Sequence, residues 1–234
     1  SEASDADVMP NAVVIMAGGL GMRLRPLTET LPKPMLPLAG KPMLQHVVES
    51  LRDEGFVDIV LSINYLGHTI EQHFGDGSAL GVNISYLSEE KPLGTGGSLS
   101  LLKRDLDGPV VVMNGDVLLG AKVGDIVRYH MDNEAEVTVG VKVFETQIPF
   151  GVILVEGSRI MGVEEKPVYS NYVNAGVYVI NPEVLAEIPR GERFDMPNIL
   201  NSRVGTPQAL AFPLHESWID IGRPVDFERA EQSL

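Results

Sequence analysis

The stretch from residue 12 to residue 41 decides the fold. It runs Ala12-Val-Val-Ile-Met-Ala-Gly-Gly-Leu-Gly-Met-Arg-Leu-Arg-Pro-Leu-Thr-Glu-Thr-Leu-Pro-Lys-Pro-Met-Leu-Pro-Leu-Ala-Gly-Lys41. Its first five residues are apolar and predict a buried β-strand bounded by turn residues. The glycines that follow permit positive φ angles, and successive backbone N–H groups in such a turn bind anions. Because four basic side chains come just behind (Arg23, Arg25, Lys33 and Lys41), the stretch predicts a phosphate-binding loop.

Two common phosphate-binding motifs do not fit this loop. No Gly-Lys-Ser/Thr closes a Walker loop, and Leu24 occupies the third glycine position of a dinucleotide fingerprint. Both motifs lead directly into a helix, whereas five prolines between residues 26 and 42 oppose one, since each removes a donor and fixes φ. We therefore expect the segment to run extended, with Lys33 displayed between two prolines on a stiff backbone.

The pattern A-G-G-x-G-x-R-L-x-P-L-T-x-x-x-P-K-P-M-L-P, followed by G-K-P, resembles the signature of the sugar-1-phosphate nucleotidyltransferases, also called NDP-sugar pyrophosphorylases. Further matches extend the resemblance to the C-terminus, and they are most similar to the mannose- and heptose-1-phosphate guanylyltransferase types. The resemblance implies a single catalytic domain over residues 12–234 with a Rossmann-like, three-layer α/β/α fold around a mixed, mostly parallel sheet. It also implies Mg²⁺-dependent transfer of a nucleotidyl group from a nucleoside triphosphate to a sugar 1-phosphate, which gives an NDP-sugar and pyrophosphate.

Composition supports an α/β enzyme. A chain of 234 residues with 44% hydrophobic content can bury a sizeable core. Its net charge of −14 argues against a nucleic-acid partner, which would require a basic face. No apolar run is long enough to span a membrane, and there is no cysteine. We expect a cytoplasmic protein without a membrane partner.

The ends of the chain carry less information. Residues 1–11 are polar and acidic without periodicity, and they predict a disordered arm or the remnant of a linker. An upstream regulatory domain outside this chain and a homo-oligomer both remain open. Beyond residue 234 we expect none of the β-helix extension that some relatives carry.

Strands and helices alternate after the loop, which predicts a mainly parallel sheet covered on both faces. We expect strands at residues 57–63, 82–87, 110–116 and 137–144, and a hairpin from residues 150–155 and 160–163. Helices are expected at residues 42–54, 69–74, 98–103, 126–131, 182–188 and 225–232, and a further one begins near residue 195.

A second glycine-rich loop, Glu89-Glu-Lys-Pro-Leu-Gly-Thr-Gly-Gly97, follows a predicted strand. The resemblance implies that this loop holds the nucleotide base. A carboxylate only accepts hydrogen bonds, so Glu89 suits the adjacent N–H groups of guanine better than the carbonyls of uracil or thymine. GTP is therefore favoured over UTP, dTTP or CTP, with Glu90 as the alternative carboxylate. The expected nucleotide-binding residues are Ala17, Gly18, Gly19, Gly21, Glu89, Pro92, Gly94 and Thr95.

The resemblance assigns the remaining site residues. Asp116, at the end of the strand in Val110-Val-Val-Met-Asn-Gly-Asp116, and Asp220 match the two ligands of Mg²⁺. Arg23 is expected to stabilise the departing pyrophosphate and Lys33 to bind phosphate, so Arg23, Lys33 and Asp116 form the catalytic set. The sugar phosphate is expected to contact Gly151, Glu165, Lys166 and Asn174, with Lys166 on the phosphate.

A different class of function is a non-catalytic sensor of nucleotide sugars that keeps the fold. Such a protein would be expected to lose Arg23, Lys33, Asp116 or Asp220, and this chain retains all four. The sequence therefore favours the enzyme. The identity of the sugar remains open.

Overall fold

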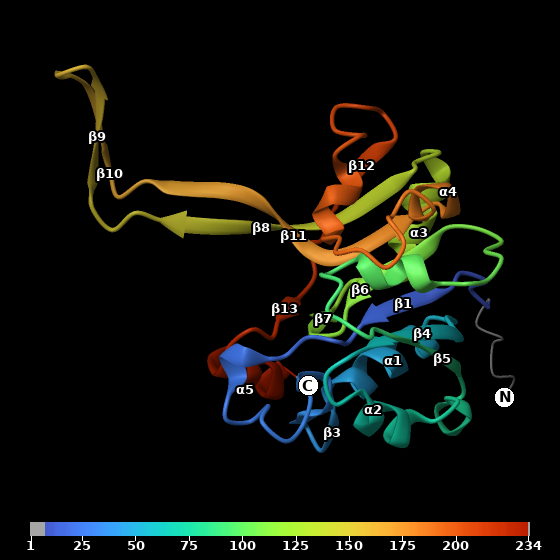
Figure 1. The fold of residues 1–234 in the computed structure, drawn as a ribbon. Coiled ribbons are helices and arrows are strands. Elements are labelled where there is room, and N and C mark those ends of the chain that lie inside the picture. The colour runs from blue at the N-terminus through green and yellow to red at the C-terminus, as the bar shows by residue number, and fades with distance from the viewer. Residues whose placement is uncertain (1–7, 234) are drawn as a thin grey trace, which may run out of the picture.

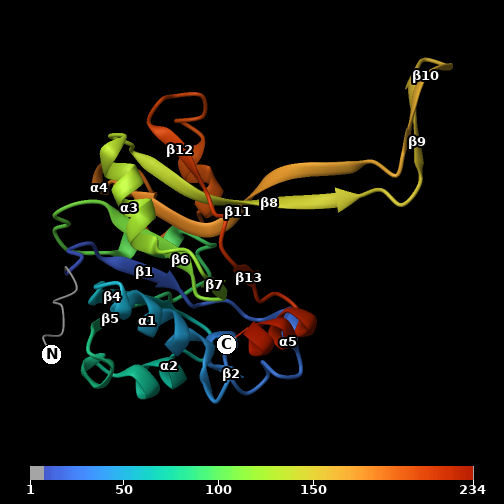
Figure 2. The ribbon, with the colours of Figure 1, turned by 180° about the vertical axis from the view of Figure 1, so that it is seen from behind.

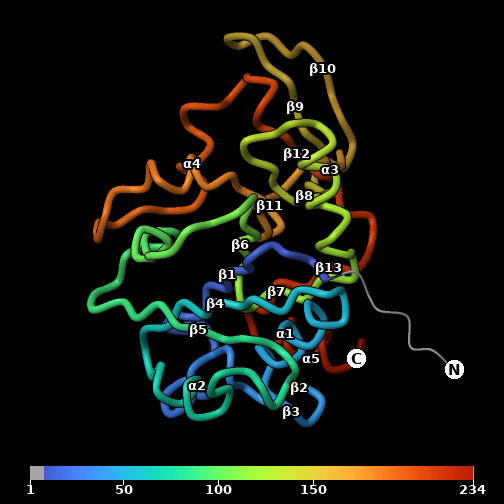
Figure 3. Tube along the Cα trace, turned by 90° about the vertical axis from the view of Figure 1, so that its right-hand side faces the viewer, coloured from blue at the N-terminus to red at the C-terminus, as the bar shows by residue number. Residues whose placement is uncertain are grey.

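The computed structural model describes residues 8–233. Its centre is a seven-stranded sheet in the order β12-β8-β11-β6-β1-β4-β5, and Figure 3 shows the strands following one another in this order. The strands are β1 (Val13–Met16), β4 (Asp58–Ile63), β5 (Asn83–Ser88), β6 (Val110–Asn114), β8 (Val137–Gln147), β11 (Val168–Ile180) and β12 (Ala209–Pro213). Only β11 runs antiparallel to its neighbours, β6 and β8. The predicted mixed, mostly parallel sheet is confirmed.

Helical segments cover both faces of the sheet (Figure 1). On one face lie α1 (Met43–Asp53), α2 (Gly67–Phe74) and α3 (Val123–Asp132). On the other lie α4 (Pro182–Leu185) and the 3₁₀ segments η4 (Gly97–Leu101) and η5 (Met196–Leu200). A last helix, α5 (Pro224–Ser233), packs beside the small hairpin of β2 (Pro37–Leu38) and β3 (Lys41–Pro42). The three-layer α/β/α architecture is therefore confirmed.

The apolar run at the start of the signature explains the position of β1. Val13 and Ile15 contribute to the core under α1 and α3, whereas Val14 contributes to the core on the opposite face. All three side chains are fully buried. Side chains alternate between the two faces of a strand, so a central strand covered on both sides requires a continuous apolar run.

The proline-rich segment differs from the extended path that we expected. It contains two 3₁₀ turns, η1 (Met22–Leu24) and η2 (Lys33–Met35). In η2 the N–H of Met35 donates to the carbonyl of Pro32 over 2.8 Å. Pro34 has no N–H, and this turn does not need one from it. The fixed φ angle of proline suits a 3₁₀ turn. A single i→i+3 turn also requires no backbone N–H at the proline positions. The predicted helices at 98–103 and after 195 are likewise short 3₁₀ segments.

A two-stranded arm projects from the sheet (Figures 1 and 2). It is formed by the distal parts of β8 and β11, and it carries a hairpin of β9 (Gly151–Glu156) and β10 (Arg159–Glu165) at its far end. The hairpin confirms the expectation for residues 150–163, whereas the arm and the length of β11 were not predicted. Because β8 runs in the same direction as β6, the arm leaves from the carboxyl edge of the parallel strands.

Residues 1–7 of the expected N-terminal arm lie outside the described residues, so its disorder stays a prediction. Just after them, Met9 pairs with Phe56 in an isolated parallel bridge. The Asn11 side-chain amide donates to the Pro109 carbonyl over 2.7 Å. Within residues 8–233, none of the helices combines the length and the apolarity needed to cross a membrane.

Candidate functional site

A cleft of about 340 Å³ opens at the carboxyl ends of β1, β4 and β6. In α/β sheets, ligands bind at this edge, where loops from neighbouring strands meet. The cleft is lined by Met16, Gly18, Gly19, Leu20, Ser62, Asn64, Glu89, Pro92, Leu93, Gly94, Thr95, Asn114 and Asp116. It therefore brings both glycine-rich loops of the sequence together with the carboxylate that follows β6.

The first glycine-rich loop is fixed at both ends. Ala17 is buried, and its N–H donates to the Ser62 carbonyl over 2.8 Å. At the other end Gly21 has a φ of +60°, and a Cβ there would lie 2.8 Å from Cγ2 of Thr28. The buried Thr28 hydroxyl donates to the Gly21 carbonyl over 2.8 Å. Gly21 is thus required by both its backbone conformation and its packing, while Gly18 and Gly19 line the cleft.

Lys33 and Asp116 form an ion pair beside the cleft. The Lys33 Nζ donates to Asp116 Oδ2 over 2.5 Å, and Lys33 is only 9% exposed. The short strand β7 (Val117–Leu119) follows Asp116 and pairs antiparallel with β13 (Trp218–Asp220). This pairing and a 2.9 Å bond from the Ile221 N–H to the Asp116 carbonyl bring the C-terminal segment to the end of β6.

Asp220 belongs to the same electrostatic site, although part of its surface is open to solvent. Burial raises the pKa of its carboxyl group, and the negative charge of Asp116 raises that pKa further, whereas Lys33 and Arg23 oppose the shift. The Arg23 guanidinium lies against Gly222, where a Cβ would be 3.5 Å from Nη1. Two carboxylates and two cations are therefore close enough to act on one another.

The donor set of this site suits Mg²⁺ only together with a phosphate ligand. Within the described residues, no group of three or more His, Cys, Asp or Glu side chains gathers to hold a metal. Mg²⁺ commonly binds through one or two carboxylates, with substrate phosphates and water supplying the other oxygens. Asp116 lines the cleft, and its charge acts on the carboxyl group of Asp220, so these two aspartates fit that pattern.

Glu89 lines the cleft on the side of the second glycine-rich loop, whereas Glu90 is exposed outside it. Oε1 of Glu89 accepts from the Leu93 N–H over 3.3 Å, and Oε2 of Glu89 lies 3.5 Å from the Asn64 amide nitrogen. Burial raises the pKa of Glu89, and these two donors partly offset the effect. Of the two adjacent carboxylates, Glu89 faces the cleft.

The second loop is braced from behind by the segment that leads into η5. Asp195 Oδ1 accepts from the Thr95 N–H over 3.1 Å, and the Thr95 hydroxyl accepts from the Met196 N–H over 2.8 Å. At Gly94, with a φ of +81°, a Cβ would lie 2.6 Å from Asp195 Oδ1 and 2.7 Å from the Phe194 carbonyl oxygen. The wall of the cleft is therefore held in place by residues about 100 positions later in the chain.

The comparison with protein families decides the classification. A family model described as "Nucleotidyl transferase" matches residues 12–234. The chain belongs to this family.

Curated relatives of this nucleotidyl transferase are named as mannose-1-phosphate guanylyltransferases. A mannose-1-phosphate guanylyltransferase of Mycobacterium tuberculosis is 37% identical over 230 residues, which cover 94% of this chain and 64% of that protein. A mannose-1-phosphate guanylyltransferase catalytic subunit beta of Danio rerio is 35% identical over 222 residues, 92% of this chain and 62% of that protein. The chain thus spans somewhat less than two thirds of the length of these relatives.

Solved structures show the same fold. A putative glucose-1-phosphate thymidylyltransferase from Bacillus anthracis superimposes with a TM-score of 0.76 at 24% identity and covers 95% of this chain and 94% of its own. HddC from Yersinia pseudotuberculosis gives a TM-score of 0.74 at 25% identity, over 95% of this chain and 99% of its own.

Some residues that the sequence assigned to the nucleotidyl transferase site lie elsewhere. Gly151, Glu165 and Lys166 are exposed at the base of the β9–β10 hairpin, where Gly151 pairs with Glu165. This hairpin stands away from the body of the molecule (Figure 2). Asn174 is nearer, because its Oδ1 accepts from the N–H of Gly176, which packs against Asn114 of the cleft. None of the four cations of the first stretch is among the residues that line the cleft. Arg23 and Arg25 are exposed, whereas Lys33 is paired with Asp116 and Lys41 with Glu49 of α1.

Sequence analysis missed three polar residues of the cleft, Ser62, Asn64 and Asn114. All three lie at or just after the carboxyl end of a parallel strand, β4 or β6. The rule that pointed to Asp116 would have found them, since the carboxyl ends of parallel strands meet at one edge.

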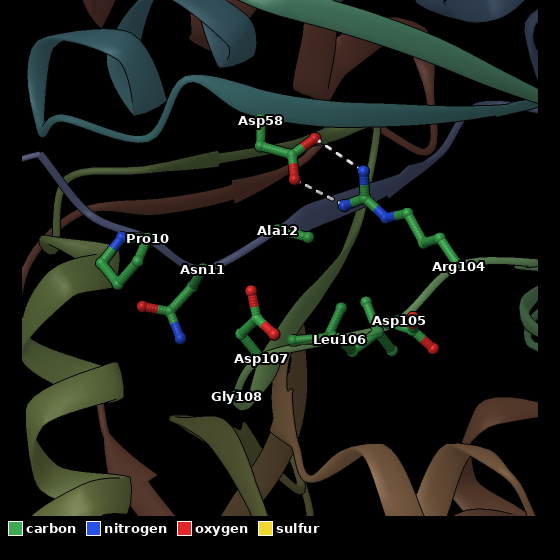
Figure 4. A pocket seen from close by; sticks show the side chains of 10 residues that line it. Pro10, Asn11, Ala12, Asp58, Arg104, Asp105, Leu106, Asp107 and Gly108 are labelled. Atoms are coloured by element: carbon green, nitrogen blue, oxygen red, sulfur yellow. Dashed lines mark hydrogen bonds and ion pairs between the residues drawn. The ribbon is translucent and has the colours of Figure 1, made fainter.

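A smaller cavity of about 160 Å³ lies at the opposite, amino edge of the sheet (Figure 4). Two of its charged side chains are paired with each other, because Arg104 donates to both carboxylate oxygens of Asp58, over 3.0 and 2.5 Å. The Asn11 side-chain amide donates to the Pro109 carbonyl. The larger cleft, which carries both glycine-rich loops and Asp116, is therefore the candidate site of this nucleotidyl transferase.

Proposed function

We propose that this chain transfers a nucleotidyl group from a nucleoside triphosphate, preferably GTP, to a sugar 1-phosphate, with release of pyrophosphate. The observation that carries the proposal is the ion pair of Lys33 with Asp116, which lies next to Asp220 and beside a cleft bordered by two glycine-rich loops. The names of the curated relatives support guanosine and mannose as the nucleoside and the sugar.

The reaction needs little acid–base chemistry from the protein. A phosphate monoester has its second pKa near 6, so the oxygen of a sugar 1-phosphate is already ionised at neutral pH. This oxygen attacks the α-phosphorus of the triphosphate, and the bond to the β-phosphate oxygen breaks as pyrophosphate leaves. The protein must hold two mutually repelling anions in line and stabilise the leaving charge.

The cationic residues divide this work. Lys33 binds phosphate oxygens of the nucleotide, and its buried position between two prolines limits the entropy it loses on binding. Arg23 faces the leaving pyrophosphate from the end of the first glycine-rich loop. Asp116 and Asp220 would hold Mg²⁺, which supplies charge neutralisation to the phosphates when it is bound.

The base is read by Glu89. Guanine presents its N1–H and its amino group side by side, and a carboxylate can accept from both. Uracil or thymine would place carbonyl oxygens against the carboxylate, which leaves a buried charged group unpaired and costs about 1–3 kcal/mol or more. The other expected nucleotide contacts that line the cleft are Gly18, Gly19, Pro92, Gly94 and Thr95.

The sugar side of the proposal rests on Asn174, Gly151, Glu165 and Lys166. Asn174 lies beside the cleft through its bond to Gly176. Binding of the sugar phosphate by Glu165 and Lys166 requires the base of the β9–β10 hairpin to approach the nucleotide cleft. The cytoplasmic location expected from the sequence also remains a prediction.

A pyrophosphate-release assay tests the proposal. GTP, UTP, dTTP, CTP and ATP are each combined with mannose, glucose and glucosamine 1-phosphates in the presence of Mg²⁺. The proposal predicts that release requires a sugar 1-phosphate and is fastest with GTP. The Asp116→Asn variant supplies the background rate. No combination exceeding that background would contradict the proposal.

A further inference from the structure

Lys142 of β8 donates to three consecutive backbone carbonyls. Its Nζ lies 3.1 Å from the carbonyl oxygen of Leu214, 3.3 Å from that of His215 and 2.7 Å from that of Glu216. An ammonium group carries three hydrogens, so its donors match these acceptors in number. Hydrogen bonds from a charged donor are about twice as strong as those between neutral groups. Lys142 therefore fixes the course of the chain over residues 214–216.

Residues 214–216 belong to the connection between β12 and β13. At its end, β12 pairs with β8, where Pro213 lies opposite Val141, and the N–H of Leu214 donates to the Val141 carbonyl over 2.8 Å. The chain then leaves the sheet, residues 215–217 are exposed, and Figure 2 shows the red segment running on past β13 to α5. Lys142 is the next residue of β8, so it binds the backbone just where the pairing of β12 ends.

The strand that this connection leads into is short. β13 has three residues and forms a two-stranded sheet with β7. Two-stranded sheets are marginally stable by themselves, so β13 depends on contacts on either side of it. The bond from the Ile221 N–H to the Asp116 carbonyl holds the chain after β13, and Lys142 holds the chain before it. Asp220 is the last residue of β13, and the position of its carboxylate follows from this backbone.

Trp218, the first residue of β13, provides a second anchor. Its indole Nε1 donates to the Ala175 carbonyl of β11 over 2.9 Å. The register between β11 and β8 shifts between Asn174 and Tyr178, and a residue in such an irregularity is left out of the ladder, so its carbonyl can accept from a side chain. Lys142 and Trp218 thus tie the same segment to two neighbouring strands, β8 and β11.

We propose that Lys142 is a positioning residue for Asp220: by binding the carbonyls of residues 214–216, it sets the place from which the Asp220 carboxylate meets the metal. This proposal rests on the proposed function, in which Asp220 holds Mg²⁺. Lys142 is not among the residues that line the cleft, so it acts through the backbone and not on a substrate. Groups that orient a metal ligand contribute about 10–100-fold to metal affinity or activity.

Tryptophan fluorescence of the whole chain tests the position of β13 without metal or substrate. Trp218 is the single tryptophan, so the emission reports on this strand alone. In Lys142→Met the loosened segment should expose the indole, which shifts the emission to longer wavelength and increases quenching by acrylamide. Lys142→Arg keeps a charged donor and should lie closer to the wild type. Lys103→Met, which removes an exposed lysine elsewhere, is the matched control and should keep the wild-type signal.

Pyrophosphate release at varied Mg²⁺ tests the consequence for the metal. The Mg²⁺ concentration that gives the half-maximal rate should rise about tenfold in Lys142→Met. The KM for GTP at saturating Mg²⁺ should change little, because Glu89 lies on the second glycine-rich loop. A purely structural role would lower the stability of Lys142→Met to urea and leave its Mg²⁺ requirement unchanged. Lys103→Met should match the wild type in both measurements.

Two results would overturn the proposal. One is a folded Lys142→Met variant with wild-type emission and quenching. The other is a variant with altered emission whose Mg²⁺ requirement and turnover equal those of the wild type. If circular dichroism shows that Lys142→Met does not fold, Lys142→Gln, which keeps two N–H donors without the charge, takes its place. Failure of the proposed function is distinct, because the wild-type chain itself then releases no pyrophosphate, and the role toward the metal falls with it.

Discussion

The Nζ of Lys33 lies 2.5 Å from Oδ2 of Asp116, although 83 positions separate the two residues in the chain. The turn Lys33–Met35 delivers the lysine, and the end of β6 delivers the aspartate. Lys33 is largely buried, so removing either partner leaves a charge without compensation. This contact joins the first glycine- and proline-rich stretch of the sequence to the expected metal site.

Lys33→Met should reduce both activity and stability. The side chain remains similar in size, but Asp116 loses its partner and the triphosphate loses a cation. A fully buried pair would cost about 3–5 kcal/mol when broken, and about 1–2 kcal/mol is expected here because Asp116 is 29% exposed. Urea unfolding measures the stability, and Lys91→Met, at an exposed position, is the control. Unchanged stability and turnover in Lys33→Met would contradict the role of the pair.

Asp116→Asn and Asp220→Asn should each lower turnover by orders of magnitude at saturating Mg²⁺, because each removes negative charge opposite the metal. Both variants should keep a wild-type circular dichroism spectrum. Asp125→Asn, on the exposed side of α3, should leave turnover unchanged. A variant at position 116 or 220 with near-normal turnover would remove that residue from the proposed site.

Arg23→Lys should depress kcat more than it raises the KM for the triphosphate. A guanidinium can bind two phosphate oxygens with a fixed fork, which an ammonium group cannot do. If the contact strengthens as charge develops on the leaving group, its loss appears mainly in kcat. Steady-state kinetics with varied triphosphate separates the two constants. An effect confined to KM would limit Arg23 to ground-state binding.

Glu89→Gln should weaken the use of GTP and narrow its advantage over UTP and dTTP, because an amide can donate as well as accept. The expected loss in kcat/KM for GTP is about tenfold to a few hundredfold, from about 1–3 kcal/mol. Glu90→Gln is the matched control, since Glu90 lies outside the cleft lining. An unchanged nucleotide ranking in Glu89→Gln would transfer base selection to other groups.

The proposed role of Glu89 also predicts that the KM for GTP depends on pH. Burial raises the pKa of Glu89 above that of an ordinary glutamate, so its carboxylate is lost at a higher pH as the solution is acidified. Guanine needs the ionised form, and the KM for GTP should therefore rise as pH falls through this raised pKa. Glu89→Gln should remove that part of the pH profile. An identical profile in both proteins would contradict the assignment.

Asp195→Ala should raise the KM for the triphosphate while leaving the KM for the sugar 1-phosphate nearly unchanged. Asp195 does not line the cleft but holds the N–H of Thr95, and Gly94 packs against it. Without this brace, the loop that borders the base should become less ordered. Asp195→Asn keeps an oxygen acceptor and should restore most of the affinity. Equal effects of both substitutions would argue for a charge effect instead of positioning.

The sequence was sufficient to predict the central sheet and most of the residues on the nucleotide side of the cleft. The apolar run before Gly18 had to be a central strand, and Asp116 at the end of a parallel strand had to lie at its ligand-binding edge. Asp220 was expected only through the family resemblance. Its position beside Asp116 depends on the pairing of β7 with β13, two strands of three residues each that carry no clear periodicity.

The arm shows what the periodicity of apolar residues in a sequence does not predict. Strand β8 begins in the core and continues into solvent, and β11 returns from solvent into the core, both without a break in strand pattern. Val143 and Tyr172 are apolar although the arm is exposed there. Alternation predicts a strand but does not show whether anything covers it. For this reason the sequence predicted a hairpin at residues 150–163 but could not place Gly151, Glu165 and Lys166 relative to the cleft.

Transfer of label from GTP tests the central claim most directly. The chain is incubated with GTP labelled at the α-phosphorus, Mg²⁺ and the sugar 1-phosphate that gives the fastest pyrophosphate release. The account predicts that the label appears in a GDP-sugar while unlabelled pyrophosphate is released in equal amount, and that label at the γ-phosphorus appears only in pyrophosphate. Label that remains in GTP, or that appears in GDP or GMP without a sugar-dependent product, would contradict it.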